Sequence, residues 1–272
     1  MIPSKFKYHN PTNLDEVLKL LSTYEEAKIL AGGHSILPMM KLRFAEPAHL
    51  IDINGIDELK GVSEENGVIS IGAMTYENDL ISSTLLQEKC PLVVDVGKLI
   101  ADPTVRNLGT IGGDIVHGDP GNDHPSLMLA LNAEFMLQGP DGNRTVAADN
   151  FFHGTYWNEM ASNEILTKIN VSAFDSNTGY GFNKLKRKAG DFATAAAVVV
   201  MKLEGGVCSE ARIALTNLGS CSFRAKEAEN ILTNQTITEE LINQAATKVM
   251  EECDPVEDLR GSIEYKKIWE RK

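Results

Sequence analysis

The chain has 272 residues, of which 43% are hydrophobic, and its formal net charge is −12. This length can bury a sizeable core in one or two domains, and no apolar run approaches the length of a membrane span. The acidic balance disfavours a nucleic-acid binder, because such a protein needs a basic face to neutralise phosphates. The first residues lack the apolar core and cleavage site of a signal peptide, so we expect a globular, cytoplasmic protein.

The cysteine and histidine spacings disfavour metal chemistry on this chain. Cys90, Cys208, Cys221 and Cys253 are scattered, with no C-x-x-C pair and no ferredoxin-like spacing. We therefore expect reduced thiols and no iron–sulfur cluster here. The histidines form neither an H-x-x-x-H nor an H-E-x-x-H pattern, which disfavours a zinc site. The sequence also offers no nucleophile–base pair, so we assign no catalytic residue.

The first third of the chain predicts a mixture of helices and strands. Residues 11–21 open with capping residues and place their apolar side chains on one face, which is typical of an amphipathic helix. Residues 27–31 predict a strand that runs directly into Gly32 and Gly33. Residues 50–54 predict another strand, and residues 59–73 alternate around an Asn66-Gly67 turn as a hairpin.

The middle of the chain contains a second glycine pair and a composition shift. Residues 97–106 lead to Gly112 and Gly113, and residues 125–131 predict a short helix. A strand then follows and ends at a turn over residues 139–142. Small and polar residues at 172–179 interrupt two apolar segments, so we place a domain boundary near residue 175, giving domains 1–175 and 176–272.

The last third predicts strands followed by helices. Residues 195–201 and 211–215 read as paired strands around a turn at Gly205 and Gly206. Residues 223–232 and 238–253 predict two helices, the second with Thr238 and Glu240 as its expected cap. The whole pattern indicates an α+β protein.

The two glycine pairs carry most of the functional information. Gly32-Gly33 and Gly112-Gly113 each follow an apolar segment and precede small polar residues. Glycine lets neighbouring N–H groups turn toward an anion, so two such nests can clamp one diphosphate; ordinary turns are the alternative interpretation. Neither pair fits G-x-x-x-x-G-K-[ST] or G-x-G-x-x-G, which disfavours P-loop NTPases and Rossmann dehydrogenases.

A basic cluster lies beyond the predicted boundary, at Lys184, Lys186, Arg187 and Lys188. It is either a solvated basic strand or loop, a wall of an anionic cofactor site, or a docking patch for an acidic partner.

Three motifs in order resemble one known family. Ala31-Gly-Gly-His-Ser35 with the following residues 37–43 and 50–53 is similar to the first flavin loop of the FAD-binding subunits of molybdenum hydroxylases. Thr110-Ile-Gly-Gly-Asp114 with residues 118–123 resembles the second loop. Residues 184–191 with 193–197 resemble the start of that family's C-terminal domain. The likeness covers nearly the whole chain and is greatest to medium subunits of the carbon monoxide dehydrogenase type.

The resemblance implies a fold and a set of binding residues. We expect a PCMH/VAO-type FAD-binding domain of two α+β subdomains, then a smaller α+β domain with a three-stranded antiparallel sheet and helices. FAD would be non-covalent, so His34 is interpreted as a loop residue near the diphosphate rather than as a covalent flavin attachment. Asp123 would contact the adenosine part, and Phe192 would lie against the flavin ring unless it is simply a core residue. The full implied set is Ala31, Gly32, Gly33, His34, Ser35, Ile36, Ile100, Thr110, Ile111, Gly112, Gly113, Asp114, Asp123, Leu166, Lys184 and Phe192.

The resemblance also implies a role in electron transfer. FAD here would accept electrons from a 2Fe-2S small subunit and pass them to an external acceptor, while a large subunit carries the molybdenum cofactor. The expected assembly is a dimer of heterotrimers of the carbon monoxide dehydrogenase or xanthine dehydrogenase type. Its substrate, which could be carbon monoxide, a purine, an aldehyde or an N-heterocycle, is not readable from this chain. A stand-alone flavin-dependent oxidoreductase acting on a small molecule is the alternative.

Overall fold

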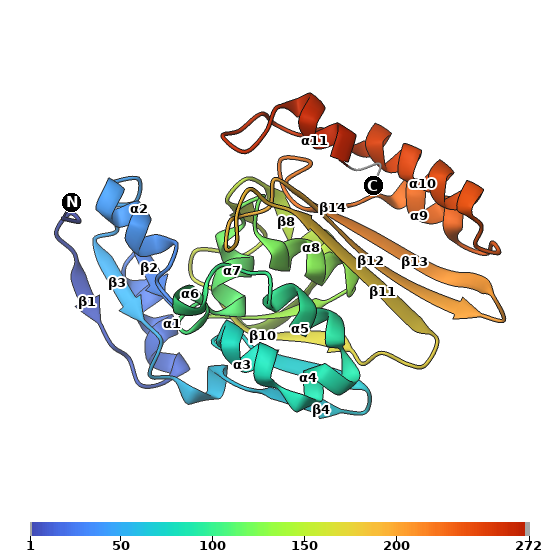
Figure 1. Cartoon of the computed structure of the whole chain (residues 1–272). Helices are drawn as coiled ribbons and strands as arrows, with labels where there is room; N and C mark the ends of the chain where they lie inside the picture. Colours follow the sequence, from blue (N-terminus) through green and yellow to red (C-terminus); the bar gives the residue numbers. More distant parts are fainter. Residues whose placement is uncertain (1, 270–272) are drawn as a thin grey trace.

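The computed structural model describes residues 2–269, which form three packed units (Figure 1). The N-terminal unit is a small parallel sheet in the order β1-β3-β2, with one helix after β1 and another after β2. Helix α1 begins where the Asn13 side chain accepts a hydrogen bond from the N–H of Glu16, and it buries Val17 and Leu21 against the sheet. The elements are β1 (Lys7–His9), α1 (Leu14–Thr23), β2 (Ala27–Leu30), α2 (Ile36–Leu42), β3 (His49–Asp52) and the 3₁₀ turn η1 (Asp57–Leu59).

The central unit is built on an antiparallel sheet in the order β4-β5-β10-β6-β7. Short helices pack on this sheet and enclose the largest apolar core of the described chain. Its strands are β4 (Val62–Glu65), β5 (Val68–Gly72), β6 (Glu134–Gly139), β7 (Gly142–Ala147) and β10 (Ile165–Ser172). Its helices are α3 (Glu77–Ser82), α4 (Thr84–Lys89), α5 (Pro91–Gly97), α6 (Pro103–Arg106), α7 (Ile111–His117) and α8 (Asp123–Ala130), and η2 (Ala148–Asn150) precedes a small hairpin of β8 (Phe152–Gly154) and β9 (Trp157–Asn158).

The C-terminal unit is an antiparallel sheet in the order β11-β12-β13-β14, with helices along one face (Figure 1). Strand side chains alternate between faces, so β12 sends Val198 and Val200 into the central core and Val199 and Met201 toward the C-terminal helices. The elements are β11 (Thr178–Leu185), β12 (Ala195–Glu204), β13 (Val207–Thr216), β14 (Phe223–Arg224), α9 (Lys226–Leu232), α10 (Glu239–Glu252) and α11 (Ile263–Trp269).

Two predictions from the sequence are corrected by this sheet. Among the described residues it has a fourth, two-residue strand in addition to the expected three, because Phe223 and Arg224 pair with the end of β13. The predicted helix over 223–232 therefore begins only at Lys226. The other C-terminal helix is confirmed as α10, and the Thr238 side chain caps it by accepting a hydrogen bond from the N–H of Leu241.

Helix α8 brings charged residues into the interior. All of its residues are buried, because it packs against β12 and β13 on one side and against α5 and α7 on others. The apolar run Leu127–Ala130 accounts for this burial. Asp123 and His124 belong to the first turn of the same helix, so they are buried with it.

Candidate functional site

The two glycine segments lie against each other at the junction of the N-terminal and central units. A Cβ added at Gly32 would fall 2.1 Å from the carbonyl oxygen of Leu108, and one added at Gly113 would lie 3.7 Å from the Cβ of Ala31. The first segment follows β2, at the carboxyl edge of the parallel sheet. Ligands commonly bind at this edge in parallel sheets, because the loops that follow the strands gather there.

The first glycine segment has a run of free backbone donors. Gly33 adopts a φ of +76°, a left-handed conformation that favours glycine and turns the chain out of β2 into α2. Among residues 2–269, no acceptor is hydrogen-bonded to the N–H groups of Gly32, Gly33, His34, Ser35 or Ile36. Neighbouring unpaired N–H groups of this kind are suited to the oxygens of an anion.

The second glycine segment is not an open loop of the kind expected from the sequence. Thr110 caps helix α7, and its side chain accepts a hydrogen bond from the N–H of Gly113 at 3.2 Å. The N–H groups of Ile111 and Gly112 donate to the carbonyls of Thr75 and Ala73, at 3.2 and 2.9 Å. These donors are already used, so glycine serves close packing here: a Cβ at Gly112 would fall 2.6 Å from the Ala73 oxygen.

A buried ion pair joins the central unit to the C-terminal sheet. Lys184 Nζ lies 2.5 Å from Asp123 Oδ2, and the two side chains are 1% and 5% exposed. Lys184 also donates to the carbonyl of Leu99 at 3.3 Å. Burial raises the pKa of Asp123 to about 6, although the positive charge of Lys184 opposes the shift. The other carboxylate oxygen, Oδ1, is buried without a hydrogen-bond partner among the described residues, so it remains available as an acceptor.

A second buried cluster includes Asp114, the last residue of the second glycine segment. His124 Nδ1 lies 3.0 Å from Asp114 Oδ2, and His124 Nε2 lies 3.5 Å from Glu77 Oε2. Burial alone would lower the pKa of His124, but the negative charges of Glu77 and Asp114 raise it to about 9. Burial raises the pKa of Glu77 to about 7, with the charge on His124 opposing it. An imidazolium therefore holds α3, α7 and α8 together at this point.

Sequence reasoning included Asp114 but missed Glu77 and His124. The local signal was a histidine three residues before the apolar run 127–131, where an unpaired charge is costly. No spacing rule connects it to Glu77, which comes from α3.

The remaining expected residues divide into those near the ion pair and those in the core. Ile100 precedes Ala101, whose carbonyl lies 3.0 Å from the Cβ position of Gly190, so residues 99–101 adjoin the segment that follows β11. Phe192 is 44% exposed, and the Arg260 guanidinium lies 5.1 Å from its ring centroid. It is therefore not a core residue. Leu166 is buried in the central core, paired with Leu137 of β6, and Ile111 is buried as well.

The basic cluster at 184–188 does not act as one surface. Lys184 points inward to Asp123, whereas the Arg187 guanidinium is paired with Asp191 at 2.9 Å on the exposed side. Part of the cluster thus forms an interior wall, and part is solvated.

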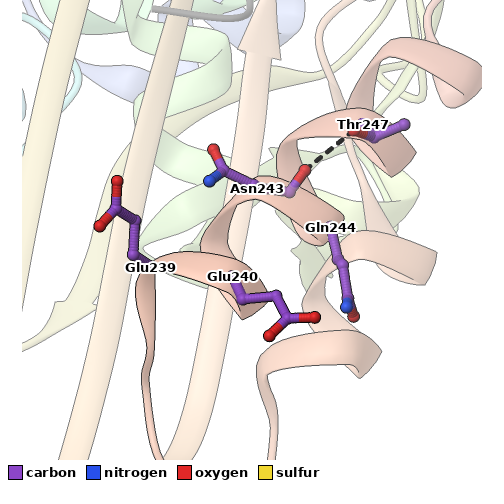
Figure 2. Close-up of a pocket in the computed structure, with 5 residues that line it drawn as sticks. All are labelled: Glu239, Glu240, Asn243, Gln244 and Thr247. Atoms are coloured by element: carbon purple, nitrogen blue, oxygen red, sulfur yellow. Dashed lines mark hydrogen bonds between the residues drawn. The ribbon is translucent and has the colours of Figure 1, made fainter.

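Elsewhere in the described chain we find no second site with comparable features. Figure 2 shows a hollow along α10 whose lining comes from that single helix, with the Thr247 hydroxyl bonded to the Asn243 carbonyl of its own helix. Within residues 2–269 no helix has the length and apolar character that a membrane crossing requires. In the same range, no group of three or more His, Cys, Asp and Glu side chains is arranged to hold a metal ion.

Comparison with known proteins places this geometry in a family. Residues 4–172 match the family described as "FAD binding domain in molybdopterin dehydrogenase", and residues 180–269 match "CO dehydrogenase flavoprotein C-terminal domain". The chain belongs to the flavoprotein-subunit family of the molybdenum hydroxylases. The predicted boundary near residue 175 falls between the two matched ranges.

Individual members of this family are similar to the chain over nearly their whole length. The carbon monoxide dehydrogenase medium chain of Hydrogenophaga pseudoflava is 53% identical over 267 residues, which cover 98% of this chain and 93% of that one. The corresponding chain of Afipia carboxidovorans is 42% identical over the same shares. Among solved structures, a carbon monoxide dehydrogenase of Hydrogenophaga pseudoflava that lacks the Mo-pyranopterin moiety has a TM-score of 0.98 and 54% identity, covering 100% of this chain and 95% of that one.

Membership of this family identifies the role of the chain. It is a FAD-binding medium subunit of the carbon monoxide dehydrogenase and xanthine dehydrogenase type, and hence an oxidoreductase subunit that transfers electrons. In this family the molybdenum cofactor and the iron–sulfur clusters are carried by partner subunits. The α+β FAD-binding domain and the α+β C-terminal domain expected from the sequence are confirmed.

Proposed function

We propose that this chain holds FAD without a covalent bond, at the junction of the first glycine segment and the Asp123–Lys184 pair. The observation that carries the proposal is the run of unpaired N–H groups from Gly32 to Ile36, which matches the anionic diphosphate of FAD. Asp123 Oδ1 is a buried acceptor without a partner, which suits a ligand hydroxyl. The residues present therefore fit the cofactor.

The remaining proposed residues support this arrangement from several sides. We assign Thr110, Ile111, Gly112, Gly113 and Asp114 to the base of the site, where they hold the two glycine segments in contact. We propose that Ile100, Lys184 and Phe192 lie around the flavin. The buried Leu166 would support that part of the site from the central core. Ala31 and His34 complete the first segment. Lys184 holds Asp123 in its charged form beside the ligand, because its own positive charge lowers the pKa of that carboxyl.

FAD supplies the electronic chemistry, since a flavin exchanges either one or two electrons and so connects one-electron clusters with a two-electron acceptor. The part played by this chain is to bind and orient. The N–H groups of the first segment neutralise negative charge locally, which matters because the whole chain carries a net charge of −12.

The partners are proposed from the relatives. Similar proteins are named as medium subunits, and one is a subunit of a dehydrogenase complex, which supports an assembly with a large and a small subunit. We propose that two such heterotrimers form a dimer in the cytoplasm. Within this chain, we propose a domain boundary near residue 175. The relatives with 53% and 42% identity are named for carbon monoxide, so we propose carbon monoxide as the substrate of the complete complex.

Two measurements test this function. Acid precipitation of the purified chain should release a yellow supernatant that contains one FAD per chain; flavin that stays in the pellet contradicts non-covalent binding. In the co-expressed complex, carbon monoxide should bleach the flavin absorption band under anaerobic conditions, whereas xanthine and aldehydes should not. Rapid bleaching of the isolated chain by any of these substrates would instead establish a stand-alone oxidoreductase.

A further inference from the structure

A chain of hydrogen bonds crosses the parallel sheet and ends on the first glycine segment. Tyr8 Oη, on β1, donates to Asp52 Oδ2 at the end of β3 at 2.5 Å. Asp52 Oδ1 accepts from the backbone N–H and from the side-chain Nδ2 of Asn54, at 2.9 and 2.8 Å. Asn54 Nδ2 also donates to the carbonyl oxygen of Ala31 at 2.8 Å. Both amide hydrogens of Asn54 are thus used, one on each side.

Local chemistry makes Asn54 a rigid donor. Asp52 accepts from the N–H two residues later, which is an Asx turn, and this turn fixes the backbone of Asn54. Burial would raise the pKa of the Asp52 carboxyl, but the hydrogen bonds from Tyr8 and Asn54 outweigh it and leave that pKa below its usual value. The carboxylate is therefore ionised at neutral pH and holds the Asn54 side chain by a charge-assisted bond.

The contact at Ala31 controls the direction of the next N–H group. The peptide unit is planar and trans, so the carbonyl of Ala31 and the N–H of Gly32 point in opposite directions. By holding that carbonyl, Asn54 turns the Gly32 N–H away from itself. The backbone of Gly32 also packs tightly against Leu108, just before the second segment, because a Cβ added at Gly32 would fall 2.1 Å from the Leu108 oxygen. This close packing leaves the peptide little freedom to rotate.

We propose that Asn54 is a positioning residue for the diphosphate of FAD, an inference that rests on the proposed function. Both N–H groups of the Asn54 amide are used by Asp52 and Ala31, so Asn54 would act through the backbone and not on the ligand itself. It sets the orientation of the first of the unpaired N–H groups, and Asp52 and Tyr8 hold Asn54 in place.

The test compares Asn54→Ala and Tyr8→Phe with the parent and with Asn170→Ala in the full chain. Asn170 is the matched control, because its half-buried side chain accepts one hydrogen bond, from Ser70 at 2.8 Å, in the central sheet. The Kd for FAD is measured by quenching of flavin fluorescence on addition of apoprotein. The orientation of the diphosphate is measured by ³¹P NMR of bound FAD, a signal that a general loss of stability does not move.

Asn54→Ala should weaken FAD binding about three- to tenfold, the value of one hydrogen bond, and should shift the ³¹P resonances. Tyr8→Phe should shift them in the same direction with an effect on Kd of about twofold, because it acts through Asp52. Asn170→Ala should change neither quantity.

Parent-like affinity and resonances in Asn54→Ala overturn the inference. If Asn54→Ala does not fold, Tyr8→Phe is the deciding variant. It should fold, because it removes only one oxygen from a residue that is 52% exposed. Unchanged ³¹P resonances in Tyr8→Phe would then overturn the inference. A parent that binds no FAD refutes the proposed function and the inference with it. If the parent binds FAD and the variants keep its affinity and ³¹P resonances, only the inference is refuted.

Discussion

Replacing Lys184 by methionine is the sharpest test of the buried ion pair. The substitution keeps a long side chain but removes the charge that lies 2.5 Å from Asp123. Asp123 Oδ1 already has no hydrogen-bond partner among the described residues, so the variant leaves both carboxylate oxygens unpartnered in the interior. An uncompensated buried charge of this kind is strongly destabilising.

The expected cost is about 3–5 kcal/mol of unfolding free energy at neutral pH, in apoprotein. For a chain of this size that corresponds to a decrease in Tm of roughly 6–20 °C. The cost depends on pH. With Lys184 present, burial already raises the pKa of Asp123 to about 6, from 3.8, and loss of the lysine charge raises it further. A carboxyl with a raised folded-state pKa stabilises the fold when protonated, so the destabilisation should shrink as the pH falls.

Urea unfolding of apoprotein at about pH 5 and about pH 8 measures both effects. The double variant Asp123→Leu/Lys184→Met is the control, because replacing both partners by apolar residues leaves no stranded charge and should recover most of the lost stability. A loss below about 1 kcal/mol at the higher pH, or an equal loss at both pH values, would refute the reasoning.

Two further substitutions test the glycine contact and the second charge cluster. Gly32→Ala places a Cβ 2.1 Å from the Leu108 oxygen, so FAD affinity should fall more than about tenfold, whereas Gly179→Ala, where an added Cβ meets nothing within 4 Å, should leave it unchanged. Equal affinities in the two variants would contradict contact between the segments. Burial raises the pKa of Glu77 from 4.5 to about 7, so this carboxyl makes parental stability fall as the pH rises through that window. Glu77→Gln cannot ionise, and its Tm should fall less between about pH 5 and pH 7; parallel curves for parent and variant would count against the cluster.

Local sequence patterns correctly predicted those helices and strands that begin or end at a capping or turn residue. The Asn66-Gly67 turn correctly predicted the hairpin of β4 and β5, and Thr238 correctly marked the start of α10. Both signals act within a few residues, so the sequence contains all of the relevant chemistry. Strand β14 had no such signal, because its two residues are extended only through pairing with β13. Tertiary pairing thus overrode the helical pattern of residues 223–232.

The buried charges at the site were also only partly predictable from the sequence. Asp123 could be expected from a motif, but its burial follows from the packing of α8 between the C-terminal sheet and α5 and α7. Glu77 and His124 become partners only because α3 and α8 meet in the central core. Contacts between such distant residues set the pKa values, and composition and spacing do not tell which residues will meet.

The two glycine pairs look equivalent in the sequence, and yet Gly112 and Gly33 differ in what lies beside them. At Gly112 the N–H is taken by Ala73, and the missing Cβ allows α7 to approach the end of β5. At Gly33 the φ is positive and the N–H has no acceptor among the described residues. Whether such an N–H donates to another part of the chain depends on which segment the fold places beside it. A glycine pair therefore indicates close approach of something to the backbone, and only the fold tells whether that something is another part of the chain or a ligand.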